Sequence, residues 1–187
     1  DRLLALLARD LLSRHPGSYV VFDVKASQAL PDEIIKYGGK PYMWKSGHSL
    51  MKQKMRELGA PLGGEVSGHL FVGENYYGFD DAPLVALKTL EIISQSDKTI
   101  AEIFDEIPKL VATPEIILDA PDDVKFAIID EIAVELAKEY EMITVDGARA
   151  VFEHGWGLVR ASNTQPAITL RFEAYETSQI VEYMGRF

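Results

Sequence analysis

Short apolar runs alternate with amphipathic segments over the first half of this 187-residue chain. The run YVVFDV at 19–24 is typical of a buried strand, and a shorter strand is expected at 41–44. The capping residues and glycines of the sequence predict helices over 1–14, 27–37, 49–58 and 81–95. Strands and helices that alternate with short connections predict an α/β fold with a parallel sheet and right-handed crossovers. Functional sites of such folds lie at the carboxyl ends of the strands.

The pattern changes after about residue 112. A strand is expected over 113–118, an amphipathic helix over 122–140, and extended runs at 142–146, 149–153 and 167–174. The Asp146-Gly147 pair is a hairpin turn signal between the first two runs. Strands that flank one helix predict a smaller α+β domain with an antiparallel sheet. We therefore expect a boundary near 108–114, with domains over 1–111 and 112–187, and the last residues of the chain resemble a helix that is cut short.

Composition argues against several classes of partner. No apolar stretch approaches the roughly 20 residues that span a bilayer, so we expect no membrane protein. The absence of cysteine excludes disulfides and thiolate chemistry and is consistent with the reducing cytoplasm. The net charge of −10 argues against nucleic acid as a partner. Because the residues after 112 include six basic and 14 acidic side chains, any anion site there must be a local construction.

The stretch RASNTQP at 160–166 has the composition of an anion site. Arg160 supplies a charged fork, Ser162 and Thr164 supply hydroxyl groups, and Asn163 supplies an amide. With closely spaced backbone N–H groups, these donors suit a phosphate dianion. The alternative is a polar turn closed by proline. An arginine at a strand end in so acidic a segment favours the anion site.

The glycine-rich stretch GGEVSGH at 63–69 is a second candidate site. Its glycines let the backbone approach a ligand closely. Glu65 and Ser67 are two residues apart, so their side chains point the same way if the loop is extended. A carboxylate beside a hydroxyl suits vicinal hydroxyl groups of a sugar. The alternative is a glycine-rich bulge with solvated polar side chains.

Two further candidates follow expected strand ends. Lys25 comes after the first buried run, and the stretch KSGHS at 45–49 lies between a strand and a helix start. The N–H groups and positive dipole end of that helix favour an anion, and Lys45 and His48 add donors. The alternatives are a solvated lysine and a histidine that only caps the helix.

The sequence contains no metal or cofactor motif that we recognise. Its four histidines are far apart and form neither a His-x-x-x-His motif nor a His-Glu pair, so no metal site is expected from this chain alone. A dinucleotide fingerprint and a Walker loop are also absent. Asp80 and Asp81 precede an apolar helix, and we expect them to form its N-cap and first turn.

Taken together, these stretches resemble motifs of the α-D-phosphohexomutase family. GEVSGH at 64–69 resembles the family's sugar-binding loop, usually Gly-Glu-Met-Ser-Gly-His, and RASNT at 160–164 resembles its phosphate-binding loop. Broader matches to the phosphomannomutase/phosphoglucomutase branch are DVK at 23–25, WKSGHS at 44–49, GFDD at 78–81, GWG at 155–157 and RFEA at 171–174. The resemblance covers nearly the whole chain. It implies the family's third domain, with three layers around a mixed sheet, followed by its smaller α+β fourth domain.

This resemblance implies the substrate-binding, C-terminal part of a hexose phosphate mutase. The parent enzyme would interconvert hexose 1-phosphate and hexose 6-phosphate through a phosphoserine and a hexose 1,6-bisphosphate intermediate. The family's first two domains carry that serine and a Mg²⁺ loop, and this chain contains neither a Ser-His-Asn-Pro segment nor an Asp-Gly-Asp-Gly-Asp-Arg loop. We therefore expect the chain alone to be inactive and to bind no Mg²⁺.

The resemblance also implies a role for each candidate residue. The distal, non-transferring phosphate is assigned to Arg160, Ser162, Asn163 and Thr164. The ring hydroxyls are assigned to Glu65 and Ser67, and the sugar or its transferring end to Lys25, His48 and His69. His69 or Lys25 is the expected general acid or base. Expected partners are hexose phosphates and the two missing domains, in a cytoplasmic monomer; the alternative is a non-catalytic sugar-phosphate-binding module.

Overall fold

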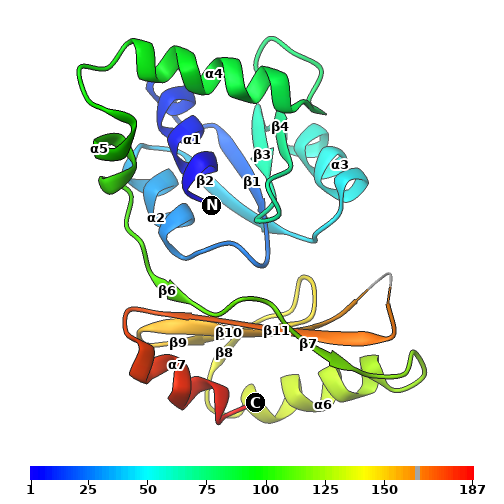
Figure 1. Ribbon diagram of the computed structural model, residues 1–187. Coiled ribbons are helices and arrows are strands. Elements are labelled where there is room, and N and C mark those ends of the chain that lie inside the picture. The colour runs from blue at the N-terminus through cyan, green and yellow to red at the C-terminus, as the bar shows by residue number, and fades with distance from the viewer. Residues whose placement is uncertain (163–164) are drawn as a thin grey trace. The chain divides into compact units, whose positions relative to one another are not determined.

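The structure is a computed structural model that describes residues 1–162 and 165–187 (Figure 1). The chain divides into two compact units, Asp1–Lys109 and Leu110–Phe187. Asn163 and Thr164, two of the expected phosphate ligands, lie outside the described residues.

A five-stranded mixed sheet forms the centre of the first unit. Its strands are β1 (Tyr19–Asp23), β2 (Lys40–Trp44), β3 (Leu62–Gly64), β4 (Leu70–Val72) and β5 (Phe79–Asp80). Their spatial order is β2-β1-β3-β4-β5. β1 runs parallel to β2 and β3, whereas β4 pairs antiparallel with β3 and with β5. The expected parallel core is confirmed, and the glycine-rich stretch 62–72 forms a short hairpin.

Helices cover both faces of this sheet and create the expected three layers. The helices are α1 (Arg2–Arg14), α2 (Ala29–Lys36), α3 (His48–Leu58), α4 (Ala82–Ser94) and α5 (Ile100–Asp105). Side chains alternate along β1, so that Val20 and Phe22 enter a core with α1, α2, α4 and α5, and Val21 enters a second core with α3. Glycine in β3 also leaves room for α3, because a Cβ at Gly63 would lie 2.7 Å from Met55 Sδ and 3.0 Å from the carbonyl oxygen of Val21.

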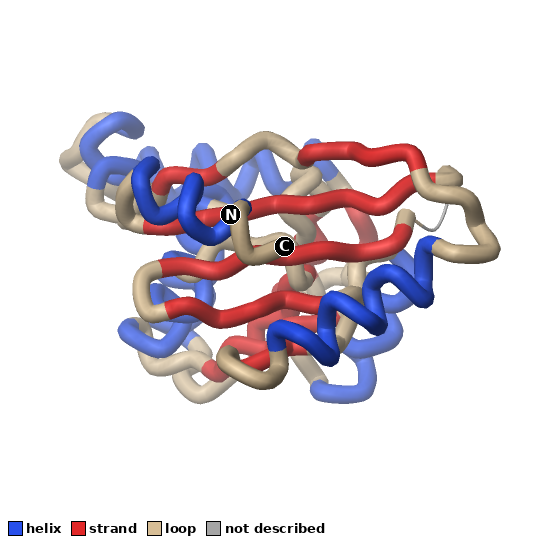
Figure 2. The backbone as a smooth tube through the Cα atoms, turned by 90° about the horizontal axis from the view of Figure 1, so that it is seen from below, coloured by secondary structure: helices blue, strands red, loops and turns tan. Residues whose placement is uncertain are grey.

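An antiparallel sheet with two helices on one face forms the second unit. Its strands are β6 (Val111–Ala112), β7 (Ile116–Asp119), β8 (Glu141–Ile143), β9 (Ala148–Phe152), β10 (Gly155–Ala161) and β11 (Ala167–Ala174). Their order is β6-β11-β10-β9-β8, and β7 also pairs with β11. α6 (Lys125–Leu136) and α7 (Thr177–Met184) pack on the face that carries Ala150, Val159 and Phe172 (Figure 2). The expected antiparallel α+β fold is confirmed.

Several elements of the second unit differ from those expected. The strand expected over 113–118 corresponds only to β7 at Ile116–Asp119, and β6 at Val111–Ala112 precedes it. The helix expected over 122–140 is limited to Lys125–Leu136. β10 was not expected, because its glycines lower strand propensity. The structure explains one of them: a Cβ at Gly157 would lie 2.6 Å from the Phe187 ring and 2.8 Å from the Phe172 ring. Close packing therefore selects glycine at the centre of this sheet.

Two short helices, α5 and α7, were not fully predicted. α5 was not expected, and a capping box between Thr99 and Glu102 starts it. α7 ends at Met184, and Gly185 follows as its C-cap.

None of the helices in the described ranges 1–162 and 165–187 has the length and hydrophobicity that a membrane span needs.

Candidate functional site

Three loops of the first unit meet at one edge of its sheet. Because β1, β2 and β3 are parallel, the segments that follow them all begin at the carboxyl edge. The segment after β1 carries Lys25, the segment after β2 carries Ser46 and His48, and the segment after β3 carries Glu65. The strand-end side chains that the sequence predicted to share a site therefore lie on the same rim.

Asp23, the last residue of β1, holds these loops together. Its side chain is fully buried; Oδ1 accepts the N–H of Val66 at 3.1 Å, and Oδ2 accepts the Ser46 hydroxyl at 3.1 Å. The Lys25 ammonium lies 3.9 Å from Oδ2. Burial raises the pKa of the Asp23 carboxyl above its ordinary value, and Lys25 and the two hydrogen bonds oppose this rise. Asp23 thus links the three loops and is not accessible to a ligand.

Glu65 is oriented by its neighbours in the loop that joins β3 to β4. Its N–H donates to the carbonyl oxygen of His69 at 2.8 Å, which closes the base of the hairpin. The buried carboxylate accepts the N–H of Gly47 through Oε1, and Oε2 lies 3.5 Å from the exposed Ser67 hydroxyl. A carboxylate and a hydroxyl therefore lie side by side, as the loop pattern predicted.

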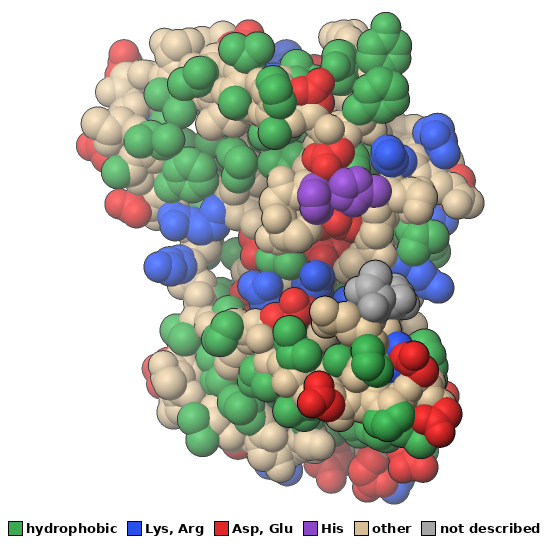
Figure 3. Space-filling model, turned by 45° about the vertical axis from the view of Figure 1, so that its right-hand side comes forward, with side chains coloured by type: hydrophobic (Ala, Val, Ile, Leu, Met, Phe, Trp, Pro, Cys, Tyr) green, Lys and Arg blue, Asp and Glu red, His purple; other side chains and the backbone are tan. Residues whose placement is uncertain are grey.

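His48 and His69 are neighbours although they come from different loops. Their ring centroids are 4.1 Å apart in an edge-to-face arrangement. Asp80 Oδ2 lies 2.7 Å from His69 Nδ1 and 3.7 Å from His48 Nε2. Asp81, in contrast, accepts the N–H of Leu84 and caps α4, so only one of the two aspartates has the capping role expected for the pair. Figure 3 shows histidine side chains gathered beside acidic side chains on one face of the molecule.

This cluster has the composition of a metal-binding group. Ligand atoms of His48, Glu65 and His69 all lie within 4.8 Å of one another. Sequence spacing predicted no metal site because residues that are distant in the chain were assumed to stay apart. The parallel strands and the hairpin bring them together.

Arg160 is the central feature of the candidate anion site in the second unit. It lies in β10, and only 8% of the residue is exposed. Its Nη2 lies 3.1 Å from Asp146 Oδ2, whereas its buried Nε has no hydrogen-bond partner among the described residues. Asp146 belongs to the connection between β8 and β9, where the sequence predicted a hairpin turn. Gly147 has a φ of +86°, and a Cβ there would lie 2.4 Å from the carbonyl oxygen of Val159.

Lys125 stabilises the candidate phosphate loop through hydrogen bonds to its backbone. Its side chain is 6% exposed, and Nζ donates to the carbonyl oxygens of Ser162 at 2.7 Å and Gln165 at 3.1 Å. Nζ also lies 2.6 Å from Asp122 Oδ1. The Ser162 hydroxyl accepts the N–H of Gln165 at 3.1 Å. These contacts fix the described residues on both sides of Asn163 and Thr164.

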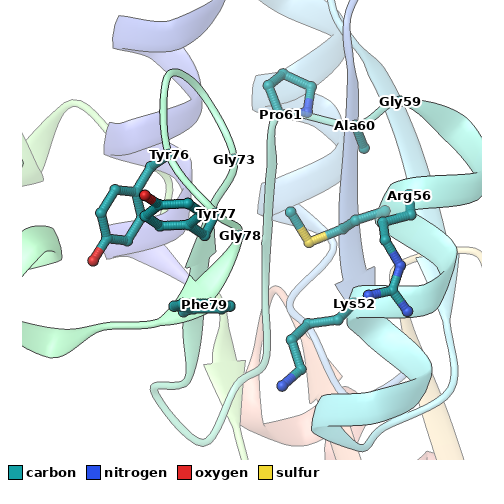
Figure 4. A pocket seen from close by; sticks show the side chains of 11 residues that line it. Lys52, Arg56, Gly59, Ala60, Pro61, Gly73, Tyr76, Tyr77, Gly78 and Phe79 are labelled. Carbon is teal, nitrogen blue, oxygen red and sulfur yellow. The ribbon is translucent and has the colours of Figure 1, made fainter.

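A separate pocket of about 420 Å³ lies beside α3 in the first unit (Figure 4). Lys52 and Arg56, one turn apart on α3, line one side, and the stacked rings of Tyr77 and Phe79 line the other. None of the residues predicted to bind substrate lines this pocket. It is therefore distinct from the histidine cluster and from the Arg160 loop.

Two family models match successive parts of the chain. Residues 1–111 match the model described as phosphoglucomutase/phosphomannomutase, alpha/beta/alpha domain III. Residues 111–187 match the model of the phosphoglucomutase/phosphomannomutase C-terminal domain. The chain belongs to the phosphoglucomutase/phosphomannomutase family. The family predicted from the loops at 64–69 and 160–164 is confirmed.

The individual relatives that the chain matches are longer proteins. It is 49% identical over 175 residues to the phosphomannomutase/phosphoglucomutase of Pseudomonas aeruginosa, covering 93% of this chain and 38% of that protein. A phosphoglucomutase/phosphomannomutase family protein from Burkholderia thailandensis has a TM-score of 0.91 at 39% identity, covering 100% and 40%. An Aspergillus fumigatus N-acetylphosphoglucosamine mutase, solved with GlcNAc-6P and magnesium, shares the fold with a TM-score of 0.69 at 16% identity, covering 99% and 42%. The chain spans about two fifths of the length of these relatives.

Three residues of this phosphoglucomutase/phosphomannomutase chain position the candidate ligands but were not predicted to do so. Asp23 was noted only within the DVK motif, Asp146 only as a turn residue, and Lys125 was not singled out. For Asp23 the sequence did contain a signal: an acidic residue at the end of an otherwise apolar strand predicts a buried carboxylate that needs hydrogen-bond partners. Lys125 gave no such signal, because a lysine near a helix start is usually solvated.

Proposed function

We propose that this chain is the substrate-binding part of a phosphomannomutase/phosphoglucomutase that interconverts hexose 1-phosphate and hexose 6-phosphate. The reaction would pass through a phosphoserine and a hexose 1,6-bisphosphate, and the serine would come from sequence outside this chain. The observation that carries the proposal is the buried Arg160, whose Nε has no hydrogen-bond partner among the described residues. A buried guanidinium in so acidic a unit calls for an anionic ligand.

The distal phosphate would bind at the Arg160 loop. Asp146 holds one terminal nitrogen of the guanidinium and thereby fixes its plane, and the oriented guanidinium would donate to a phosphate oxygen. Ser162, whose hydroxyl accepts the N–H of Gln165, is proposed as a further ligand of the same phosphate. Asn163 and Thr164 complete the proposed ligand set.

The sugar ring would bind at the carboxyl edge of the first unit's sheet. The N–H of Gly47 orients the Glu65 carboxylate, so this group can accept hydrogen bonds from sugar hydroxyls at little further loss of side-chain entropy. Ser67 supplies the neighbouring hydroxyl. Lys25 and His48 would contact the sugar or the phosphate that is transferred.

His69 is the proposed general acid or base. The attacking sugar hydroxyl must lose its proton as its oxygen bonds to the phosphorus of the phosphoserine and the serine oxygen leaves. If His69 donates its Nδ1 proton to Asp80, its Nε2 lone pair is available to accept that hydroxyl proton. Lys25 is the second candidate for this role, and its ammonium lies 3.9 Å from Asp23 Oδ2.

The Mg²⁺ implied by the family would be held by sequence outside this chain. It would supply charge stabilisation at the transferred phosphoryl group. The residues described here would bind and orient the substrate and move a proton.

Turnover and binding assays on the purified chain test this proposal. We expect no conversion of mannose 1-phosphate to mannose 6-phosphate, because the chain lacks the phosphoryl donor. We expect calorimetric binding of glucose 6-phosphate and glucose 1,6-bisphosphate but not of glucose. A chain that converts mannose 1-phosphate, or that binds glucose as well as its phosphates, would contradict the proposal.

The non-catalytic alternative makes a different prediction for a longer protein. A sugar-phosphate-binding module would give no turnover even within a longer protein that also carries a phosphoserine domain and a Mg²⁺ loop. A mutase would gain turnover in that longer protein, and substitution of Arg160 should then raise KM more than it lowers kcat.

A further inference from the structure

We propose that His48, Glu65 and His69 also form a binding site for a divalent transition-metal ion such as Zn²⁺. The site would be distinct from the magnesium loop that the family implies outside this chain. It uses two imidazoles and one carboxylate, a donor set that suits zinc in proteins. Mg²⁺ prefers oxygen ligands alone, so the same cluster should discriminate against it.

The geometry of the cluster is close to that of a metal site. The three ligand atoms lie within 4.8 Å of one another. Ligands around a tetrahedral zinc ion lie about 3.3 Å apart, given metal–ligand distances of about 2.0–2.2 Å. The side chains of His48 and His69 are 43% and 44% exposed, so rotation of these rings can bring their nitrogen atoms to the distances that a metal ion requires. The fourth position would remain open to water or a ligand.

Neighbouring groups already orient these ligands. Asp80 Oδ2 lies 2.7 Å from His69 Nδ1, an arrangement that fixes the tautomer with Nε2 available to a metal. The N–H of Gly47 holds Oε1 of Glu65, which leaves Oε2 for the ion. A carboxylate behind a metal-binding histidine is the usual second partner of zinc sites.

The backbone keeps the ligands close together in the absence of a metal. His48 is the first residue of α3, and Glu65 directly follows β3. The N–H of Glu65 donates to the carbonyl of His69 at 2.8 Å, so these two ligands are joined across the base of one hairpin. The charges around the cluster include the carboxylates of Asp80 and Asp23, and Lys25 is paired with Asp23. The charge of Lys25 is offset by Asp23, so the charges of these groups favour a bound cation.

The metal and the sugar would compete for the same side chains. This consequence rests on the proposed function, which assigns Glu65, His48 and His69 to the sugar. Zn²⁺ would then inhibit the complete mutase by displacing substrate from this edge of the sheet. The metal site itself does not depend on the sugar assignment.

Metal titration of the 187-residue chain tests the inference. Zn²⁺ binding is measured by calorimetry, and Co²⁺ binding by the visible absorption bands of a tetrahedral cobalt site. We expect one site per chain, with affinity reduced at least tenfold in His48→Gln and in His69→Gln. Asp80→Asn should weaken binding about tenfold, since outer-shell partners typically contribute 10–100-fold. Thermal unfolding of each variant checks that the fold is retained.

The two remaining histidines provide a matched control. His15 lies 2.9 Å from Glu74, and His154 lies 3.7 Å from Glu153, so both are histidine–carboxylate pairs outside the cluster. The double variant His15→Gln/His154→Gln should keep the wild-type affinity for Zn²⁺ and the cobalt bands. Equal loss in this control, or unchanged affinity in His48→Gln and His69→Gln, would overturn the inference.

A competition arm separates this inference from the proposed function. Glucose 6-phosphate should lower the apparent Zn²⁺ affinity more than the same concentration of inorganic phosphate, which chelates zinc but carries no sugar. If Zn²⁺ binds through the cluster but glucose 6-phosphate does not bind at all, the proposed function fails and the metal site stands. If glucose 6-phosphate binds but no cluster-dependent Zn²⁺ binding occurs, the metal inference alone is wrong.

Discussion

Replacement of Lys125 by methionine should destabilise the second unit and its phosphate loop. The Lys125 ammonium is the donor for the carbonyl oxygens of Ser162 and Gln165 in a largely buried position. Hydrogen bonds to charged groups contribute about 1.5–3 kcal/mol each, and both acceptors would lose this donor. Its contact with Asp122 adds little, because that carboxylate is 74% exposed. Since methionine retains much of the apolar stem, we expect a loss of about 2–4 kcal/mol in the free energy of unfolding.

Fluorescence of Trp156 measures this effect in the unit concerned. The chain has two tryptophans, so a Trp44→Phe background leaves only the buried Trp156 of β10 as the reporter. Urea unfolding is compared between Lys125→Met and the control Lys138→Met, whose side chain is 62% exposed and pairs with Glu135. The control should lose less than about 0.5 kcal/mol. Equal stability of the two variants would refute the supporting role of Lys125.

Two further predictions concern Asp23 and Gly147. Because burial raises the pKa of Asp23, the folded state holds this proton more tightly than the unfolded state, so the contribution of Asp23 to stability falls as pH rises above about 4. The difference in free energy of unfolding between wild type and Asp23→Asn should therefore decline with rising pH, and a difference that stays constant in urea titrations from pH 4 to 8 would contradict this. Gly147→Ala should lose about 2–4 kcal/mol, because it combines a left-handed backbone with overlap against the carbonyl of Val159. The control is Gly17→Ala, at a position with a φ of +81° where an added Cβ would have no atom within 4 Å. It should lose only about 1–2 kcal/mol. Thermal unfolding of both variants measures the two losses, and equal losses would show that the overlap at Gly147 is relieved.

The sequence predicted the parts of this molecule that depend on local pattern. Buried runs and helix caps located the strands β1 and β2, and these strands in turn predicted that Lys25 and the segment with His48 would share one edge. The pair Asp146-Gly147 located a hairpin because glycine accepts a positive φ. In each of these cases the determining interactions lie within a few residues of one another.

Other parts could not be predicted because they depend on contacts between distant segments. Position 157 of β10 is glycine because Phe172 and Phe187 pack against it, and neither contact is visible in the local sequence. Asp23 and Lys125 acquire their roles only when loops from elsewhere in the chain supply hydrogen-bond partners. The histidine cluster was missed for the same reason, since its ligands come from α3 and from the β3–β4 loop and no known spacing motif joins them.

The most direct test of the account is the contribution of Arg160 to sugar-phosphate affinity. Glucose 6-phosphate is titrated by calorimetry into wild type, Arg160→Ala, Arg160→Lys and Ser162→Ala, and Trp156 fluorescence confirms that each variant is folded. A charge-assisted contact worth about 1.5–3 kcal/mol predicts that Arg160→Ala binds ten- to a hundredfold more weakly. Lysine should recover only part of this loss, because a point charge lacks the planar fork, and Ser162→Ala should lose less than Arg160→Ala. Equal affinity of wild type and Arg160→Ala would contradict the account and leave this loop as a polar turn.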